Sequence, residues 1–98
     1  MIIQEVLFQL KSATSPVFKI LQSSDHVKVI VLGFKRGMIL KEHQTAIPAK
    51  LIIIDGSVIY KEAGRTVTMN KYEDVDIPIN VTHSVEAVED SICFLIKG

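Results

Sequence analysis

Short apolar stretches rich in Val and Ile alternate with polar turn segments along the whole chain. The turn segments recur about every 8 to 12 residues, a spacing typical of an all-β sandwich or barrel. The chain has 14 Ile and 11 Val against 7 Leu and 5 Ala, and β-branched residues favour strands over helices. No segment has a clear helical period, so the pattern predicts an all-β fold.

Ten strands follow from this pattern, and two tight hairpins connect some of them. Asp55-Gly56 lies between two apolar stretches, and this dipeptide favours a two-residue hairpin turn. We expect a second hairpin around Glu89-Asp90. The expected strands are Val6–Leu10, Val17–Leu21, Val27–Phe34, Ile39–Gln44, Lys50–Ile54, Ser57–Tyr60, Arg65–Met69, Val75–Ile79, His83–Val88 and Ile92–Ile96.

The segment Leu51–Ile54 is apolar at four successive positions. Successive side chains of a strand point to opposite faces, so both faces of this strand must be covered. A second subunit against the outer face would make the protein a homodimer. A chain terminus folded over the same surface would serve as well.

Length and charge narrow the class of protein. A chain of 98 residues has room for one domain, which we expect to span residues 1–98. The 11 basic and 11 acidic residues cancel, so charge gives no reason to expect a nucleic acid or membrane partner. One cysteine cannot form an internal disulfide and no export signal is visible, so we expect a cytoplasmic protein.

The first stretch that suggests a functional site begins at Gly37. The chain reads Gly37, five residues, His43, one residue, Thr45, three residues, Ala49, six residues and Gly56. This spacing resembles the first motif of the cupin superfamily, whose pattern is Gly, five, His, one, His, three or four, Glu, six, Gly. Thr45 stands where that motif has its second His, and Ala49 stands where it has its Glu.

A second stretch resembles the other cupin motif, Gly, five, Pro, one, Gly, two, His, three, Asn. Pro78, Asn80 and His83 keep this spacing, whereas Tyr72 replaces the first Gly and Ala87 the final Asn. The two stretches cover about half of the chain. The resemblance implies a cupin-type jelly-roll β-barrel, also called a double-stranded β-helix, with Gly37, Gly56 and Pro78 in structural roles.

In cupins, the motif histidines and Glu point into the barrel and hold a divalent metal. Here His43 and His83 remain, whereas Thr45 and Ala49 have replaced two ligands. Catalytic zinc sites use three protein ligands, and many iron oxygenases use two His and a carboxylate. The resemblance therefore implies a degenerate site, with no cofactor or a weakly held Zn, Fe, Mn or Ni ion at His43 and His83. Replacing the lost ligand with Glu42 or Glu86 would require a β-bulge, because both are out of phase with the inward side chains.

Three functions remain open at this point. The first is a small-molecule binding barrel, in which His43, Thr45 and His83 contact the ligand and Leu51 and Val85 form apolar walls. The alternative is a metal-dependent enzyme of the oxygenase, isomerase or decarboxylase type that uses His43 and His83. A scaffold protein that binds a partner through Leu51–Ile54 is a third possibility.

Four further residues, outside the metal-ligand positions, have side chains that could take part in a site. We expect His26 to lie in a solvated loop and Cys93 to be a small core residue. Tyr60 and Tyr72 could place a hydroxyl at a pocket rim, although Tyr60 fits the core or an interface equally well.

Overall fold

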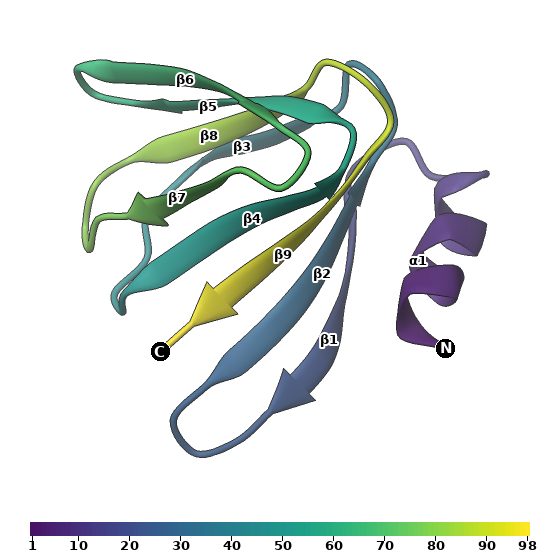
Figure 1. The fold of residues 1–98 in the computed structure, drawn as a ribbon, viewed down its shortest axis with the longest axis horizontal. Coiled ribbons are helices and arrows are strands. Elements are labelled where there is room, and N and C mark those ends of the chain that lie inside the picture. Colours follow the sequence, from purple (N-terminus) through teal and green to yellow (C-terminus); the bar gives the residue numbers. More distant parts are fainter.

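A computed structural model describes residues 1–98 and shows two antiparallel sheets packed face to face, with one helix against the larger sheet (Figure 1). The larger sheet has the strand order β1-β2-β9-β4-β7, and the smaller has the order β3-β8-β5-β6. The elements are α1 (Ile2–Leu10), β1 (Val17–Ser23), β2 (Lys28–Phe34), β3 (Ile39–His43), β4 (Ala49–Asp55), β5 (Ser57–Glu62), β6 (Arg65–Asn70), β7 (Asp74–Ile77), β8 (His83–Ala87) and β9 (Ser91–Lys97).

The all-β prediction is confirmed for nine strands, but the first expected strand is wrong. Residues 2–10 form α1, whose buried side chains Val6 and Leu10 are four positions apart, one turn of a helix. Ile2 and Ile3 extend the same apolar face. Five of these nine residues are Ile, Val or Leu. This high apolar content suggested a strand and obscured the helical spacing of the buried residues. The helix is also too short to span a membrane.

The two expected hairpins are also wrong, because each lies where the chain crosses between sheets. β4 pairs with β7 and β9, whereas β5 pairs with β6 and β8. Only Gly56 separates β4 from β5, with φ at 87°. A Cβ atom there would lie 2.3 Å from the carbonyl oxygen of Asp90. Gly56 therefore forms a sharp corner against the β8–β9 connection, which is the other crossing.

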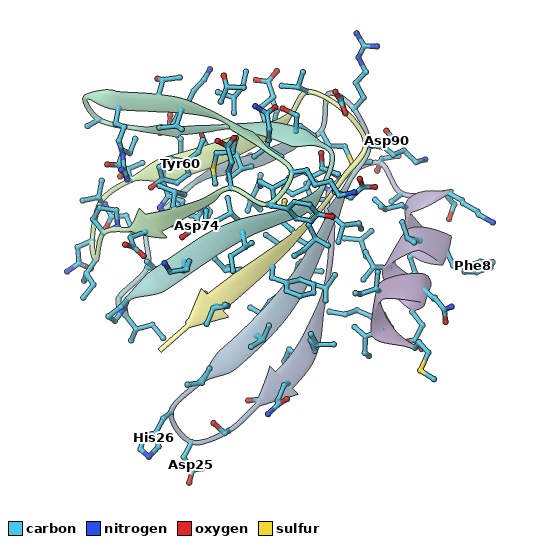
Figure 2. The ribbon with its side chains drawn as sticks, viewed as in Figure 1. Phe8, Asp25, His26, Tyr60, Asp74 and Asp90 are labelled. Atoms are coloured by element: carbon cyan, nitrogen blue, oxygen red, sulfur yellow. The ribbon has the colours of Figure 1, made fainter.

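The main core lies between the two sheets and comprises 14 buried residues, among them Phe34, Leu51, Tyr60 and Cys93. Cys93 is fully buried, which confirms it as a core residue, and burial raises the pKa of its thiol to about 12. His26 lies exposed at the tip of the β1–β2 hairpin, as expected (Figure 2).

Helix α1 covers part of the outer face of the larger sheet. Val6 and Leu10 form a second buried cluster with Val31 and Ile92, and Ile54 packs against it. Phe8 points away from the sheet and is 70% exposed (Figure 2). A chain terminus therefore supplies the cover that Ile54 requires, which is one of the two arrangements expected for Leu51–Ile54.

Candidate functional site

A row of four polar residues crosses the smaller sheet at one end of the barrel. His43 on β3 is directly opposite His83 on β8, His83 is opposite Glu62 on β5, and Glu62 is opposite Arg65 on β6. Residues that are directly opposite on paired strands have side chains on the same face. The next row into the barrel is apolar apart from the Tyr60 hydroxyl: Leu40, Val85, Tyr60 and Val67. The polar row thus marks where the packed core ends.

A β-bulge in β3 turns His43 into this row. Leu40 pairs with Val85 and His43 pairs with His83, so three steps along β3 match two steps along β8. Without the extra residue, alternation would direct Glu42 to the face that Leu40 occupies. Instead Glu42 is exposed. A bulge is therefore present in β3, but it turns His43 inward and Glu42 outward, so Glu42 does not replace a lost ligand.

Both imidazoles direct Nδ1 at a backbone carbonyl oxygen. Nδ1 of His43 lies 2.8 Å from the carbonyl oxygen of Lys41, and Nδ1 of His83 lies 3.1 Å from that of Val81. A carbonyl oxygen only accepts a hydrogen bond, so each Nδ1 carries the proton. In a neutral ring, Nε2 is then left as an acceptor. The two rings meet edge to face with centroids 4.1 Å apart.

His83 is held in its neutral form. Burial lowers its pKa from 6.5, and the neighbouring His43 acts in the same direction. The hydrogen bond to the Val81 carbonyl and the charge of Glu62 oppose this shift without reversing it. The His83 side chain is only 3% exposed and lies nearly parallel to the Tyr60 ring, with centroids 5.9 Å apart.

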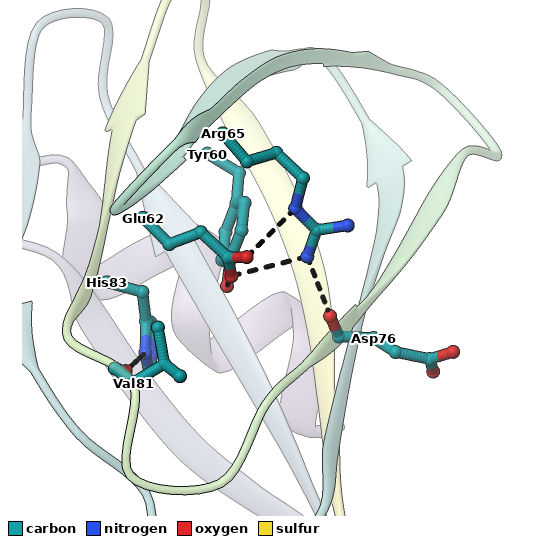
Figure 3. A network of polar contacts seen from close by, with 6 residues as sticks. All are labelled: Tyr60, Glu62, Arg65, Asp76, Val81 and His83. Atoms are coloured by element: carbon teal, nitrogen blue, oxygen red, sulfur yellow. Dashed lines mark hydrogen bonds and ion pairs between the residues drawn. The ribbon is translucent and has the colours of Figure 1, made fainter.

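Glu62 is the centre of a polar network beside His83 (Figure 3). The Tyr60 hydroxyl donates to Glu62 Oε2 at 2.5 Å, and Arg65 Nη2 donates to the same oxygen at 3.2 Å. Arg65 Nε lies 3.1 Å from Glu62 Oε1. Arg65 Nη2 also donates to the Asp76 carbonyl oxygen at 3.1 Å, which ties the network to β7.

This network shifts the pKa values of its members in opposite directions. Burial, followed by the hydrogen bond to Glu62, raises the pKa of Tyr60 to about 12. The hydrogen bond from Tyr60 lowers the pKa of Glu62, and Arg65 lowers it further. Glu62 is therefore a carboxylate at neutral pH, and Tyr60 remains a hydrogen-bond donor to it.

Sequence reasoning missed Glu62 and Arg65, although the chain contains a signal for both. Glu62 is two residues after Tyr60, so the two share a face of β5. Ala63-Gly64 is the two-residue turn between β5 and β6, which makes Glu62 and Arg65 cross-strand partners. The ligands predicted from the sequence were motif positions and the adjacent Glu42 and Glu86, and Glu62 lies outside both motifs.

Thr45 and Ala49 have structural roles, one in a loop and the other in the core. Thr45 is buried, and its hydroxyl donates to the carbonyl oxygen of Ile47 at 3.0 Å, within the loop that follows β3. Ala49 is part of the main core. Leu51 and Val85, the expected walls of a ligand cavity, belong to the same packed core below the polar row. A ligand would therefore meet the open end of the barrel rather than its interior.

A shallow depression opens at this end, lined by Glu42, Lys61, Glu62, Ala63, Thr82, His83 and Ser84. Its residues come from the ends of β3, β5 and β8, which are neighbours in the smaller sheet, and from the turns beside them. The depression therefore reaches Glu62 and His83 of the polar row.

The side chains at this end do not complete the metal site that the fold family implies. The two histidines present Nε2 lone pairs, an arrangement suited to metal ligation. However, no group of three His, Cys, Asp or Glu side chains lies close enough together to hold an ion. Both carboxylate oxygens of Glu62 are engaged by Tyr60 and Arg65. The donor set thus offers two ligands where a resident divalent metal requires three or more.

The backbone supports the motif assignment at the positions of the family's glycines. The only non-glycine residues with positive φ are Tyr72, at 73°, and Asn80, at 59°. Both occupy glycine positions of the second motif. Gly37 and Gly56, the glycines of the first motif, have φ of 84° and 87°. Tyr72 and Asn80 therefore have the positive φ that favours glycine, at the two positions where the second motif has glycine.

Solved structures with the same fold include a cupin family protein, KdgF and a DMSP lyase. An RmlC-like cupin family protein with a double-stranded β-helix fold from Methanocaldococcus jannaschii is 21% identical, over 90% of this chain and 84% of that chain, with a TM-score of 0.77. KdgF from Halomonas sp. is 17% identical, over 88% and 82%, with a TM-score of 0.79. The DMSP lyase DddQ from Ruegeria pomeroyi is 14% identical, over 85% and 46%, with a TM-score of 0.79.

The chain therefore has the cupin fold, a jelly-roll barrel of the double-stranded β-helix type, as its motifs indicate. Protein-family models and curated proteins give no match to the sequence. At these identities the structural similarity defines the fold alone, and a function must be argued from the site.

Proposed function

We propose that this protein binds a small organic molecule at the open end of its barrel, through His43 and His83, without a resident metal. The supporting observation is the pair of imidazoles whose Nδ1 atoms are bonded to the backbone carbonyls of Lys41 and Val81. The two Nε2 atoms then offer acceptors to a ligand that donates hydrogen bonds, such as a hydroxylated compound.

The surroundings suit recognition of a small polar molecule. The depression that includes Glu62, Thr82 and His83 is lined mainly by polar side chains. The buried Tyr60 and Val85 form an apolar floor below the polar row. Thr45 has a smaller part in this proposal, because its hydroxyl already donates to the loop backbone.

The enzyme alternative has less support. It would require His43 and His83 to hold a catalytic metal, and the chain supplies no third ligand in the conformation described. The DMSP lyase with this fold is 14% identical, so its activity is not a guide to the chemistry of this chain.

Two-dimensional amide NMR of the ¹⁵N-labelled protein tests the proposal. Pools of sugars, polyols and hydroxy acids are added in the presence of EDTA. We expect at least one compound to give saturable shifts at the ends of β3, β5 and β8. His43→Ala should abolish these shifts, whereas His26→Ala, at the far hairpin tip, should preserve them. Binding that disappears with EDTA, or that survives His43→Ala, would contradict the proposal.

A further inference from the structure

A second pocket, of about 200 Å³, lies between the C-terminal end of α1 and the larger sheet. It is at the end of the barrel away from the polar row. β8 begins at His83 in that row and ends at Ala87, and Asp90, in the connection that follows, lines the pocket (Figure 2). Pockets for drug-sized ligands usually measure roughly 300 to 1,000 Å³, so this one suits a smaller molecule.

The floor of this pocket is apolar. Leu7 and Leu10 of α1 and Ile92 of β9 contribute to it. Leu10 and Ile92 are buried, whereas the Leu7 side chain is 49% exposed. An apolar group of a ligand placed over Leu7 would remove part of this surface from water, which is favourable.

Two lysines and two aspartates surround the apolar floor. Lys35 directly follows β2 and donates from Nζ to the Lys11 carbonyl oxygen at 3.0 Å, so the two lysines lie together. Asp55 ends β4, and β9 separates β4 from β2. Gly56, the residue after Asp55, packs against the Asp90 backbone. The basic groups therefore gather beside α1 and β2, and the acidic groups gather beside β4.

These opposite charges do not neutralise each other by direct contact. Neither Lys11 nor Lys35 forms an ion pair with Asp55 or Asp90, and the one ion pair of this group joins Asp55 Oδ1 to Lys71 Nζ at 4.0 Å. Charged groups on both sides of an apolar floor complement a ligand that carries both charges and an apolar side chain.

We propose that this pocket binds a free α-amino acid with an aliphatic side chain, such as leucine. The ammonium group of the ligand contacts Asp55 and Asp90, and its carboxylate contacts Lys35. Its side chain lies over Leu7. The Arg36 backbone N–H donates to Asp90 Oδ1 at 2.8 Å, which orients this carboxylate and leaves Oδ2 for the ligand. Lys35 Nζ has two further donors, since an ammonium group has three.

Amide NMR titration of the ¹⁵N-labelled full chain tests the proposal with leucine, isoleucine and valine. We expect at least one of them to give saturable shifts at the C-terminal end of α1, the end of β4 and the start of β9. The matching amine and carboxylic acid, which for leucine are isoamylamine and isocaproate, each lack one charge. Both should bind at least about tenfold more weakly. The proposal is wrong if no amino acid gives saturable shifts, or if either analogue binds as tightly.

Asp55→Asn removes one of the two contacts to the ammonium group. It should weaken amino acid binding by about fivefold or more. Asp25→Asn is the matched control, because it removes the same charge at the far tip of the β1–β2 hairpin (Figure 2), and it should leave the affinity unchanged. Equal affinities of the two variants would contradict the assignment of Asp55.

Leu7→Ala is a second variant, which tests the apolar floor without changing any charge. We expect it to weaken binding by about fivefold, from the loss of apolar contact. Phe8→Ala is its control on the same helix, because Phe8 points away from the sheet (Figure 2) and does not line the pocket. A Leu7→Ala protein that binds as tightly as Phe8→Ala would count against the proposal. His43→Ala, at the other end of the barrel, should not affect this binding, so the two proposed sites can fail separately.

Discussion

Tyr72 carries backbone strain that the motif normally avoids with glycine. Its φ of 73° lies in the left-handed region, which is unfavourable for a bulky residue. The side chain is 75% exposed, and its ring lies 5.1 Å from Lys71 Nζ. An exposed cation–π contact contributes only about 0.5 to 1 kcal/mol, so the contact does not remove the strain.

We expect Tyr72→Gly to raise the free energy of unfolding by about 0.5 kcal/mol. Relief of roughly 1 kcal/mol of strain is partly offset by the greater freedom of glycine in the unfolded chain. Asn80→Gly is the control and should change stability less, because Asn tolerates this conformation. Urea unfolding followed by circular dichroism measures both. A clear loss of stability in Tyr72→Gly would mean that the tyrosine ring makes a stabilising contact.

His83 should make the protein sensitive to acid. Its pKa is lowered in the folded state, so below about pH 6.5 the unfolded chain binds more protons than the folded one. The contribution of His83 to stability is therefore present above this pH and is lost as the pH falls through the folded-state pKa. We expect His83→Gln to lose less stability than the unmodified protein between pH 7 and pH 5. Parallel stability curves for the two proteins would contradict this assignment.

At the scale of elements, helix α1 depends on a glycine beneath it. A Cβ atom on Gly33 would lie 2.5 Å from Val6 Cγ1 and 2.8 Å from Leu10 Cδ1. Gly33 thus allows the helix to approach β2 closely enough for Val6 to be fully buried. The packing of α1 against the sheet is decided by this one position.

Gly33→Ala should lower the free energy of unfolding by about 1 to 3 kcal/mol, the usual effect of overpacking. Val6→Ala removes one of the clashing atoms, so the double variant should be less destabilised than the sum of the two single variants. Denaturant titrations of all three proteins test this coupling. Additive losses would show that α1 does not pack on Gly33 as described.

Sequence predicted the elements better than it predicted their pairing. Strand positions follow from local alternation, and nine were found within a few residues of their observed bounds. Whether Asp55-Gly56 makes a hairpin or a corner depends on the Asp90 carbonyl, which is distant in sequence. The same limit applied to the site. His43 and His83 follow from motif spacing, whereas Glu62 enters the row only through its register with β8.

At the scale of the whole molecule, the outer face of the larger sheet remains only partly covered. Ile52, Phe94 and Ile96 are half-buried there, and Ile52 is directly opposite Phe94. These side chains point away from the main core, since Leu51, Ile53 and Leu95 between them are buried in it. An apolar surface of this kind is a candidate for contact with a second copy of the chain.

We therefore predict a homodimer that forms through this face. Light scattering at micromolar concentration should give twice the mass of the chain. Ile52→Glu should shift the protein to a monomer, because a charge would be buried in the contact. Ile39→Glu, at an exposed position on the smaller sheet, should leave the mass unchanged. A monomeric mass for the unmodified protein would overturn the prediction.

The central claim is that the open end of this barrel presents two histidines to a small molecule and lacks a resident metal. Elemental analysis of protein purified without an affinity tag or chelator tests it most directly, followed by titration with Fe²⁺, Mn²⁺, Ni²⁺ and Zn²⁺ while thermal stability is measured. We predict far less than one metal per chain, and little stabilisation by any of these ions. A near-stoichiometric metal that is lost in His43→Ala would contradict the claim and favour the metal-dependent enzyme.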